Sequence, residues 1–121
     1  MDCIILQNTY CACMDMSIQL RTLLPDIQIA YIAEEALQIV HWLTQTDSHP
    51  DCIIADTEAC DGDTIDIFRH AGIQIPLILT CSSPDEVANC SGLNVAGTIL
   101  KPVSLKGLRT MLPAIYNYCS L

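Results

Sequence analysis

The feature that most constrains the fold of this chain is a repeated alternation of short apolar runs with longer segments of helical periodicity. Each run has four to six residues, and together they are rich in Ile, Val and Leu, as strands buried on both faces are. The runs cover residues 3–6, 27–31, 52–55, 75–79 and 95–100. A helix-like segment follows each run, so the order strand then helix occurs five times.

Residues that typically start or stop helices stand at the ends of these intervening segments. Pro25 ends the first, Gly72 the third and Gly92 the fourth, while Ser104 can cap the last. Because Ser83 precedes Pro and acidic residues, we expect a short fourth helix to begin there. The predicted helices cover residues 10–24, 34–45, 64–71, 84–91 and 104–118.

Two of these segments support more detailed predictions. In the first helix, Cys11, Met14 and Ile18 lie on one stripe, with Leu20, Leu23 and Leu24 beside it, and this apolar side is expected to face the core. In the second, Glu34 and Glu35 are expected in the first turn, where acidic side chains complement the helix dipole.

A fivefold strand–helix repeat with nearly continuous apolar strands predicts an α/β fold with a parallel sheet covered on both faces. Right-handed crossovers leave few arrangements, and the common one for five strands is the doubly wound, flavodoxin-like order 2-1-3-4-5. The 121 residues suit one domain, residues 1–121, without a linker or internal repeat.

Composition and charge exclude several classes of function. Fourteen acidic against five basic residues give a net charge of −9, so we expect no direct binding to nucleic acid. No apolar run is long enough to span a membrane, and the first residues lack the basic segment of a secretory signal. We therefore expect a cytoplasmic location and no membrane partner.

Eight cysteines allow three interpretations. A disulfide framework needs a secreted context, and a zinc site needs CxxC pairs or His at ligand spacing, of which Cys11-x-Cys13 is the nearest approach. The favoured interpretation is that most of them are small buried hydrophobes. Cys60 and Cys81 flank the predicted site, where a nearby lysine could lower a thiol pKa, but small packed side chains are the better explanation.

Polar residues stand at the ends of four neighbouring strands of the predicted sheet. Asp56 follows the third strand, Thr80 the fourth and Lys101 the fifth, while Gln7 and Asn8 follow the first. Sites in doubly wound sheets form at the carboxyl ends of the strands, so these side chains should converge. A carboxylate can attack a phosphoryl group, and an ammonium and a hydroxyl can hold its oxygens.

At these positions the sequence resembles the receiver domains of two-component signalling (CheY-like), over essentially the whole chain. Pro50-Asp51-Cys52-Ile53-Ile54-Ala55-Asp56 resembles the strand that ends in the family's phosphorylated aspartate. Leu77-Ile78-Leu79-Thr80-Cys81 resembles the strand that ends in its switch hydroxyl. Gly97-Thr98-Ile99-Leu100-Lys101-Pro102 resembles the strand that ends in Lys-Pro. The opening Met-Asp-Cys-Ile-Ile-Leu and Leu93-Asn94-Val95 are most similar to receivers of the LytR/AlgR type.

The resemblance implies roles for individual residues. Asp56 would accept a phosphoryl group from a histidine kinase or small phosphodonor, Thr80 would move toward the phosphate, and Lys101 would pair with it. The peptide bond before Pro102 would be cis, and Glu58 would stand where the family offers a carbonyl to Mg²⁺. Catalysis would be limited to self-phosphotransfer and autodephosphorylation at Asp56.

The sequence departs from the family at three positions. Gln7 and Asn8 replace two acidic residues that hold Mg²⁺ in the family, and a hard dication prefers carboxylate oxygens. Metal binding by Asp56, Asn8 and Glu58 is therefore expected to be weak or absent. Thr98 replaces the usual aromatic switch residue.

These departures leave an alternative function open, that of a degenerate receiver acting unphosphorylated as a protein-interaction module. A flavodoxin-like nucleotide binder is disfavoured because residues 8–12 lack a glycine-rich phosphate loop. The surface of the fourth helix, fifth strand and fifth helix would serve as a dimer or partner surface, and an output domain is a partner if the chain is part of a longer regulator. Most of the apolar residues there should pack inside: Ile99, Leu105, Leu108, Met111, Leu112 and Ile115.

Overall fold

The computed structural model describes residues 1–119, with the side chains of residue 112 and residues 114–119 outside the description. Five parallel strands form the sheet: β1 (Asp2–Leu6), β2 (Gln28–Ala33), β3 (Cys52–Asp56), β6 (Leu77–Cys81) and β7 (Val95–Leu100). Their order is β2-β1-β3-β6-β7, which is the predicted doubly wound order 2-1-3-4-5. The predicted fold class is thus confirmed.

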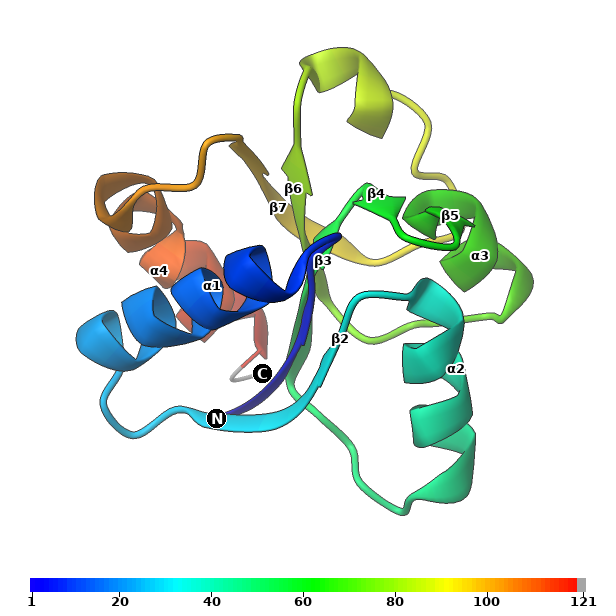
Figure 1. The fold of residues 1–121 in the computed structure, drawn as a ribbon, viewed down its shortest axis with the longest axis horizontal. Coiled ribbons are helices and arrows are strands. Elements are labelled where there is room, and N and C mark those ends of the chain that lie inside the picture. The colour runs from blue at the N-terminus through cyan, green and yellow to red at the C-terminus, as the bar shows by residue number, and fades with distance from the viewer. Residues whose placement is uncertain (120–121) are drawn as a thin grey trace.

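Helices cover both faces of this sheet (Figure 1). α1 (Tyr10–Leu23) and α4 (Leu105–Cys119) lie on one side, and α2 (Ala36–Gln45) and α3 (Thr64–His70) lie on the other. Alternate residues of each strand point to opposite faces, so β1 sends Cys3 and Ile5 to one core and Ile4 and Leu6 to the other. The central strands β1, β3 and β6 are almost completely buried.

The segment between β6 and β7 differs from its prediction. Instead of a helix over residues 84–91, there is one 3₁₀ turn, η1 (Pro84–Val87). The guanidinium of Arg69 on α3 donates to the carbonyls of Asn89 at 2.8 Å and Ser91 at 2.9 Å. These two hydrogen bonds attach the segment after η1 to α3.

The buried face of α1 differs in part from its prediction, since Leu20 is buried and Met14 partly buried as expected. Ile18 is 64% exposed and Cys11 is exposed, whereas the buried residues are Cys13, Met16, Ser17 and Leu20. Apolar side chains occur around most of this helix, so more than one stripe has the same helical period. Packing against the sheet selects the stripe that includes Cys13 and Leu20.

The start of α2 differs as well, because Glu34 and Glu35 precede the helix and do not lie in its first turn. A small antiparallel hairpin of β4 (Glu58–Ala59) and β5 (Gly62–Asp63) provides an acidic side chain at the start of α2 in their place. Asp61 at its tip accepts hydrogen bonds from the amides of Ala36 at 2.8 Å and Leu37 at 2.9 Å. The hairpin after β3 is thus attached to the start of α2.

Along β7 and α4, the described residues bear out part of the predicted packing. Ile99 and Leu108 are buried, whereas Leu105 is 37% exposed. The predicted contributions of Leu112 and Ile115 lie outside the described side chains.

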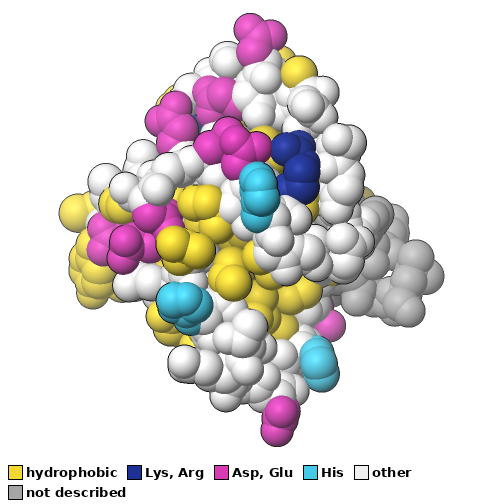
Figure 2. All heavy atoms as spheres, turned by 90° about the vertical axis from the view of Figure 1, so that its right-hand side faces the viewer, with side chains coloured by type: hydrophobic (Ala, Val, Ile, Leu, Met, Phe, Trp, Pro, Cys, Tyr) yellow, Lys and Arg dark blue, Asp and Glu magenta, His cyan; other side chains and the backbone are white. Residues whose placement is uncertain are grey.

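Surface charge follows the composition. On the face that carries α2 and α3, acidic side chains gather toward one end and basic side chains are sparse (Figure 2). Within the described part of the chain, none of the helices is long and apolar enough to cross a membrane.

Candidate functional site

The carboxyl edge of the sheet brings Asp56, Thr80 and Lys101 together. Asp56 is the last residue of β3, and Thr80 stands directly beside it in the register of β6. Lys101 follows β7, and its Nζ is 3.0 Å from both Oδ1 and Oδ2 of Asp56. The three strand ends predicted to converge therefore do so.

The carboxylate of this ion pair is buried and its ammonium is partly exposed. Asp56 is only 1% exposed, whereas the Lys101 side chain is 24% exposed. An isolated charge in such an environment would be highly unfavourable, so the carboxylate needs its partner. The amide of Glu58 donates a third hydrogen bond to Asp56 Oδ1 at 3.0 Å. Asp56 is thus enclosed by a cation and a backbone amide.

The residues after β1 contact the site in different ways. Gln7 is 3% exposed, and its Nε2 donates to the hydroxyl of Thr80 at 3.3 Å. Asn8 is half-buried, and its carbonyl accepts a hydrogen bond from the thiol of Cys60 at 2.9 Å. Gln7 therefore binds the residue that the resemblance names as the switch hydroxyl.

The remaining predicted site residues lie around this centre. The side chain of Glu58 is exposed, and Thr98 is exposed on β7, in register with Leu79. The Lys101–Pro102 peptide bond is cis. Thr98 thus does not take a place in the Asp56 cluster.

The donor set at this edge does not fit Mg²⁺. Both oxygens of the Asp56 carboxylate already contact the Lys101 ammonium. Gln7 and Asn8 present amides where carboxylates would serve a hard dication better. Within the described residues, no group of three or more His, Cys, Asp or Glu side chains could hold a metal ion.

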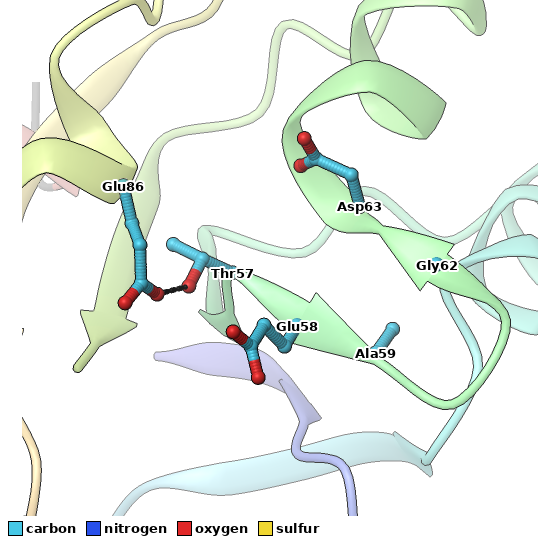
Figure 3. A pocket seen from close by; sticks show the side chains of 6 residues that line it. All are labelled: Thr57, Glu58, Ala59, Gly62, Asp63 and Glu86. Carbon is cyan, nitrogen blue, oxygen red and sulfur yellow. Dashed lines mark hydrogen bonds between the residues drawn. The ribbon is translucent and has the colours of Figure 1, made fainter.

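Sequence reasoning missed a second carboxylate next to the site, Glu86 on η1. One of its oxygens accepts a hydrogen bond from the hydroxyl of Thr57 at 2.5 Å. The other accepts hydrogen bonds from the backbone amides of Ser82 and Ser83 at 3.0 Å each. Figure 3 shows Glu86 reaching across to Thr57, the residue after Asp56. The sequence signal was the pattern Ser83-x-x-Glu86, which is typical of a capping box.

These contacts change the acidity of Glu86. The hydrogen bond from Thr57 lowers the pKa of this carboxyl most, and the amides of Ser82 and Ser83 and the charge of Lys101 lower it further, against a smaller opposing effect of burial. Glu86 is therefore anionic over a wider pH range than a free glutamate, and it joins the loop after β3 to the loop after β6.

A cavity of about 330 Å³ opens beside this link. Its walls include Glu58, Asp63 and Glu86, whose carboxylates come from the hairpin and from η1 (Figure 3). Asp63 also accepts the amide of Ile65 at the start of α3. These carboxylates make the approach to the site acidic on this side.

The cysteines near the site have raised thiol pKa values. Burial raises the pKa of Cys81 most, and Glu86 raises it further, while Lys101 opposes this shift. For Cys60, desolvation and then Glu34, Glu35 and Asp61 raise the pKa. Because the thiolate is the reactive form, neither position favours an activated thiol. The thiols of Cys60 and Cys81 are not in disulfides.

Comparison with known proteins identifies the fold. No protein-family model and no curated protein sequence matches this chain. Among solved structures, a CheY-like receiver domain of a response regulator from Methylobacillus flagellatus aligns with a TM-score of 0.74 at 13% identity, over 94% of this chain and 97% of that one.

Two further structures give the same result. The response regulatory domain of mrkE from Klebsiella pneumoniae aligns with a TM-score of 0.81 at 16% identity, over 99% of this chain and 98% of that one. The N-terminal domain of a response regulator/sensory box/GGDEF three-domain protein from Carboxydothermus hydrogenoformans has a TM-score of 0.81 at 17% identity, with the same two coverages. The chain therefore has the CheY-like receiver fold.

Proposed function

We propose that this chain is a two-component signal-transduction receiver in which Asp56 accepts a phosphoryl group from a histidine kinase or a small phosphodonor. The observation that carries the proposal is the meeting of Asp56, Thr80 and Lys101 at the carboxyl edge of a CheY-like sheet. Beyond transfer to and hydrolysis from Asp56, no enzymatic activity is proposed.

The chemistry follows from the groups at this edge. An Asp56 oxygen attacks phosphorus, and the bond from phosphorus to the donor breaks. The Lys101 ammonium, already 3.0 Å from both carboxylate oxygens, moves onto the phosphoryl oxygens, and the Thr80 hydroxyl becomes a second donor. Lys101 is the main source of positive charge, so transfer is expected to be slow.

Signal output would use the surface of η1, β7 and α4. Leu100 is 56% exposed and Leu105 is 37% exposed on it, which suits contact with a second copy, a partner or an output domain. Added phosphate carries a charge of about −1.5 to −2 and would shift a two-state equilibrium at the β6–η1 loop. The LytR/AlgR subtype is part of this proposal and rests on residues 1–6 and 93–95.

Phosphorylation is tested by incubation with acetyl phosphate or a histidine kinase, followed by intact mass measurement. We expect the mass of one phosphoryl group to appear on the native chain and to be absent from Asp56→Asn. Lys101→Ala should lower the yield, because it removes the charge that faces the phosphate. If no donor modifies the native protein, the proposal is wrong.

The second candidate is a phosphorylation-independent interaction module with the same fold. Two observations favour this module. Lys101 already pairs with the buried Asp56, and Gln7 and Asn8 carry amides in place of carboxylates. In this case Asp56→Asn should leave partner binding and signalling unchanged. Gln7→Asp/Asn8→Asp should then add Mg²⁺-dependent phosphorylation that the native chain lacks.

A further inference from the structure

A cavity of about 460 Å³ lies between α1 and the segment that follows β7. Small-molecule sites are concave, largely apolar and supplied with a few polar groups, and this cavity has those properties. Its apolar walls are Ala12, Met16, Pro102 and Val103, and its polar walls are Gln7, Asp15, Gln19 and Lys101. It adjoins the Asp56 cluster through Gln7 and Lys101 but does not include Asp56.

Gln19 is one of the polar residues that line this cavity. Its Nε2 donates to Asp15 Oδ2 at 2.9 Å, which sets the orientation of the amide, because the reverse would place two oxygens together. Gln19 Oε1 is then buried and finds no donor within the described part of the chain. A buried acceptor without a donor is unfavourable.

The charges around the cavity favour a cation. Lys101 is neutralised by Asp56, whose two oxygens it contacts. The ion pairs among the described residues, Lys101 with Asp56 and Arg69 with Asp66, leave Asp15 without a cationic partner. The whole chain carries a net charge of −9. An anion would therefore be repelled here and a cation attracted.

We propose that this cavity binds a small primary amine or guanidine with a compact apolar body. The cationic group lies between Asp15 and Gln19, and the apolar body packs on Met16, Pro102 and Val103. Such a ligand contacts Gln7, which binds Thr80, and Lys101, which binds Asp56. Its binding therefore alters the positions of the groups around Asp56. This proposal does not depend on phosphorylation of Asp56.

The test is a titration of ¹⁵N-labelled, unphosphorylated protein with 2-phenylethylamine, followed by amide chemical shifts. Phenylacetate, which has the same ring and the opposite charge, is the matched probe. We expect saturable shifts in residues 12–19 and 101–104 with the amine, and none that saturate with the acid. Asp15→Asn should weaken binding about two- to fivefold. Asp47→Asn makes the same charge change on the exposed loop after α2 and should leave the affinity unchanged.

Val103→Trp fills the cavity and should abolish binding, with circular dichroism as the check on folding. Asp15 is exposed, so its variant keeps the test decisive even if the tryptophan variant does not fold. Equal binding of both probes, full binding by Asp15→Asn, or shifts centred on residues 56–58 would each overturn the proposal. A failure of phosphorylation by acetyl phosphate would not alter any of these outcomes.

Discussion

At the scale of single residues, the site depends on Lys101 as much as on Asp56. A carboxylate that is 1% exposed is stable as an anion only with compensation, and Lys101 provides a contact of 3.0 Å to each oxygen. Each residue is thus part of the other's stability as well as of the proposed chemistry.

Lys101→Met tests this dependence, because methionine keeps an unbranched side chain and removes the charge. We expect a loss of about 2–4 kcal/mol in the free energy of unfolding, less than for a fully buried pair because Lys101 is partly exposed. The double variant Asp56→Asn/Lys101→Met should recover most of the lost free energy of unfolding, since no unpaired charge remains. Urea denaturation measures both, with Lys106→Met on the exposed side of α4 as the control. An additive double variant would contradict the argument.

Glu86 should make stability depend on pH. Its folded-state pKa is lowered, first by Thr57, so its contribution is fully present above the ordinary pKa of glutamate. That contribution is lost as the pH falls through the lower, folded-state value. In thermal unfolding, the difference in midpoint between the native chain and Glu86→Gln should therefore shrink as the pH falls below the ordinary glutamate pKa. In a Thr57→Val background, the difference in midpoint caused by Glu86→Gln should be smaller. A difference in midpoint that does not change with pH would contradict the role given to Glu86.

At the scale of elements, the hairpin after β3 joins the site to α2. Asp61 lies between β4 and β5 and caps a helix that begins 25 residues earlier in the chain. Because the same loop starts at Asp56, a change at the site can reach α2 through this cap. The sequence gives no local sign of the contact, since a capping residue is normally adjacent to its helix.

Asp61→Ala should destabilise the protein by about 1 kcal/mol, the usual effect of removing a helix N-cap. The amides of Ala36 and Leu37 should lose protection from hydrogen exchange, because both donate to this carboxylate. Asp47→Ala changes an exposed acid on the loop after α2 and should have neither effect. Unchanged protection at both amides would show that Glu34 or Glu35 caps the helix instead.

At the scale of the whole molecule, the sheet separates two apolar cores. Leu20 of α1 is buried on one face and Phe68 of α3 on the other, each at 0% exposure. The strands between them send side chains to both cores, so we expect one cooperative folding unit.

Leu20→Ala and Phe68→Ala test this unit. Each should cost about 2–5 kcal/mol, since both leave a buried cavity. Trp42, the single tryptophan, packs on the α2–α3 side, where it stacks on Tyr31 with ring centroids 5.3 Å apart. In Leu20→Ala, on the opposite face, its fluorescence and far-UV circular dichroism should still report the same denaturation midpoint. Separate midpoints would show that the two cores unfold independently.

Much of this architecture could be predicted because its determinants are local. Apolar runs in the segments that form β1, β3 and β6 specify buried strands, and their alternation with helices restricts the topology to the observed order. The strand-end rule also predicted which polar residues would meet, because parallel strands end at the same edge of a sheet. Asp56 beside Thr80 and Lys101 follows from that register.

The details that failed depend on partners distant in sequence. The predicted fourth helix is a single 3₁₀ turn, and Arg69 of α3 binds two carbonyls of the segment after it. Ile18 is exposed because the sheet selects another stripe of α1. The link from Glu86 to Thr57 likewise spans 29 positions.

The sequence by itself determined the order of the elements and the residues at the sheet edge, since periodicity and strand ends are local properties. Only the tertiary structure decided how those residues pair: Lys101 with Asp56, Gln7 with Thr80, and Asp61 with the start of α2. Hydrogen bonds and ion pairs form or fail on differences of a few tenths of an ångström between their atoms, and only the packing of distant segments sets those positions.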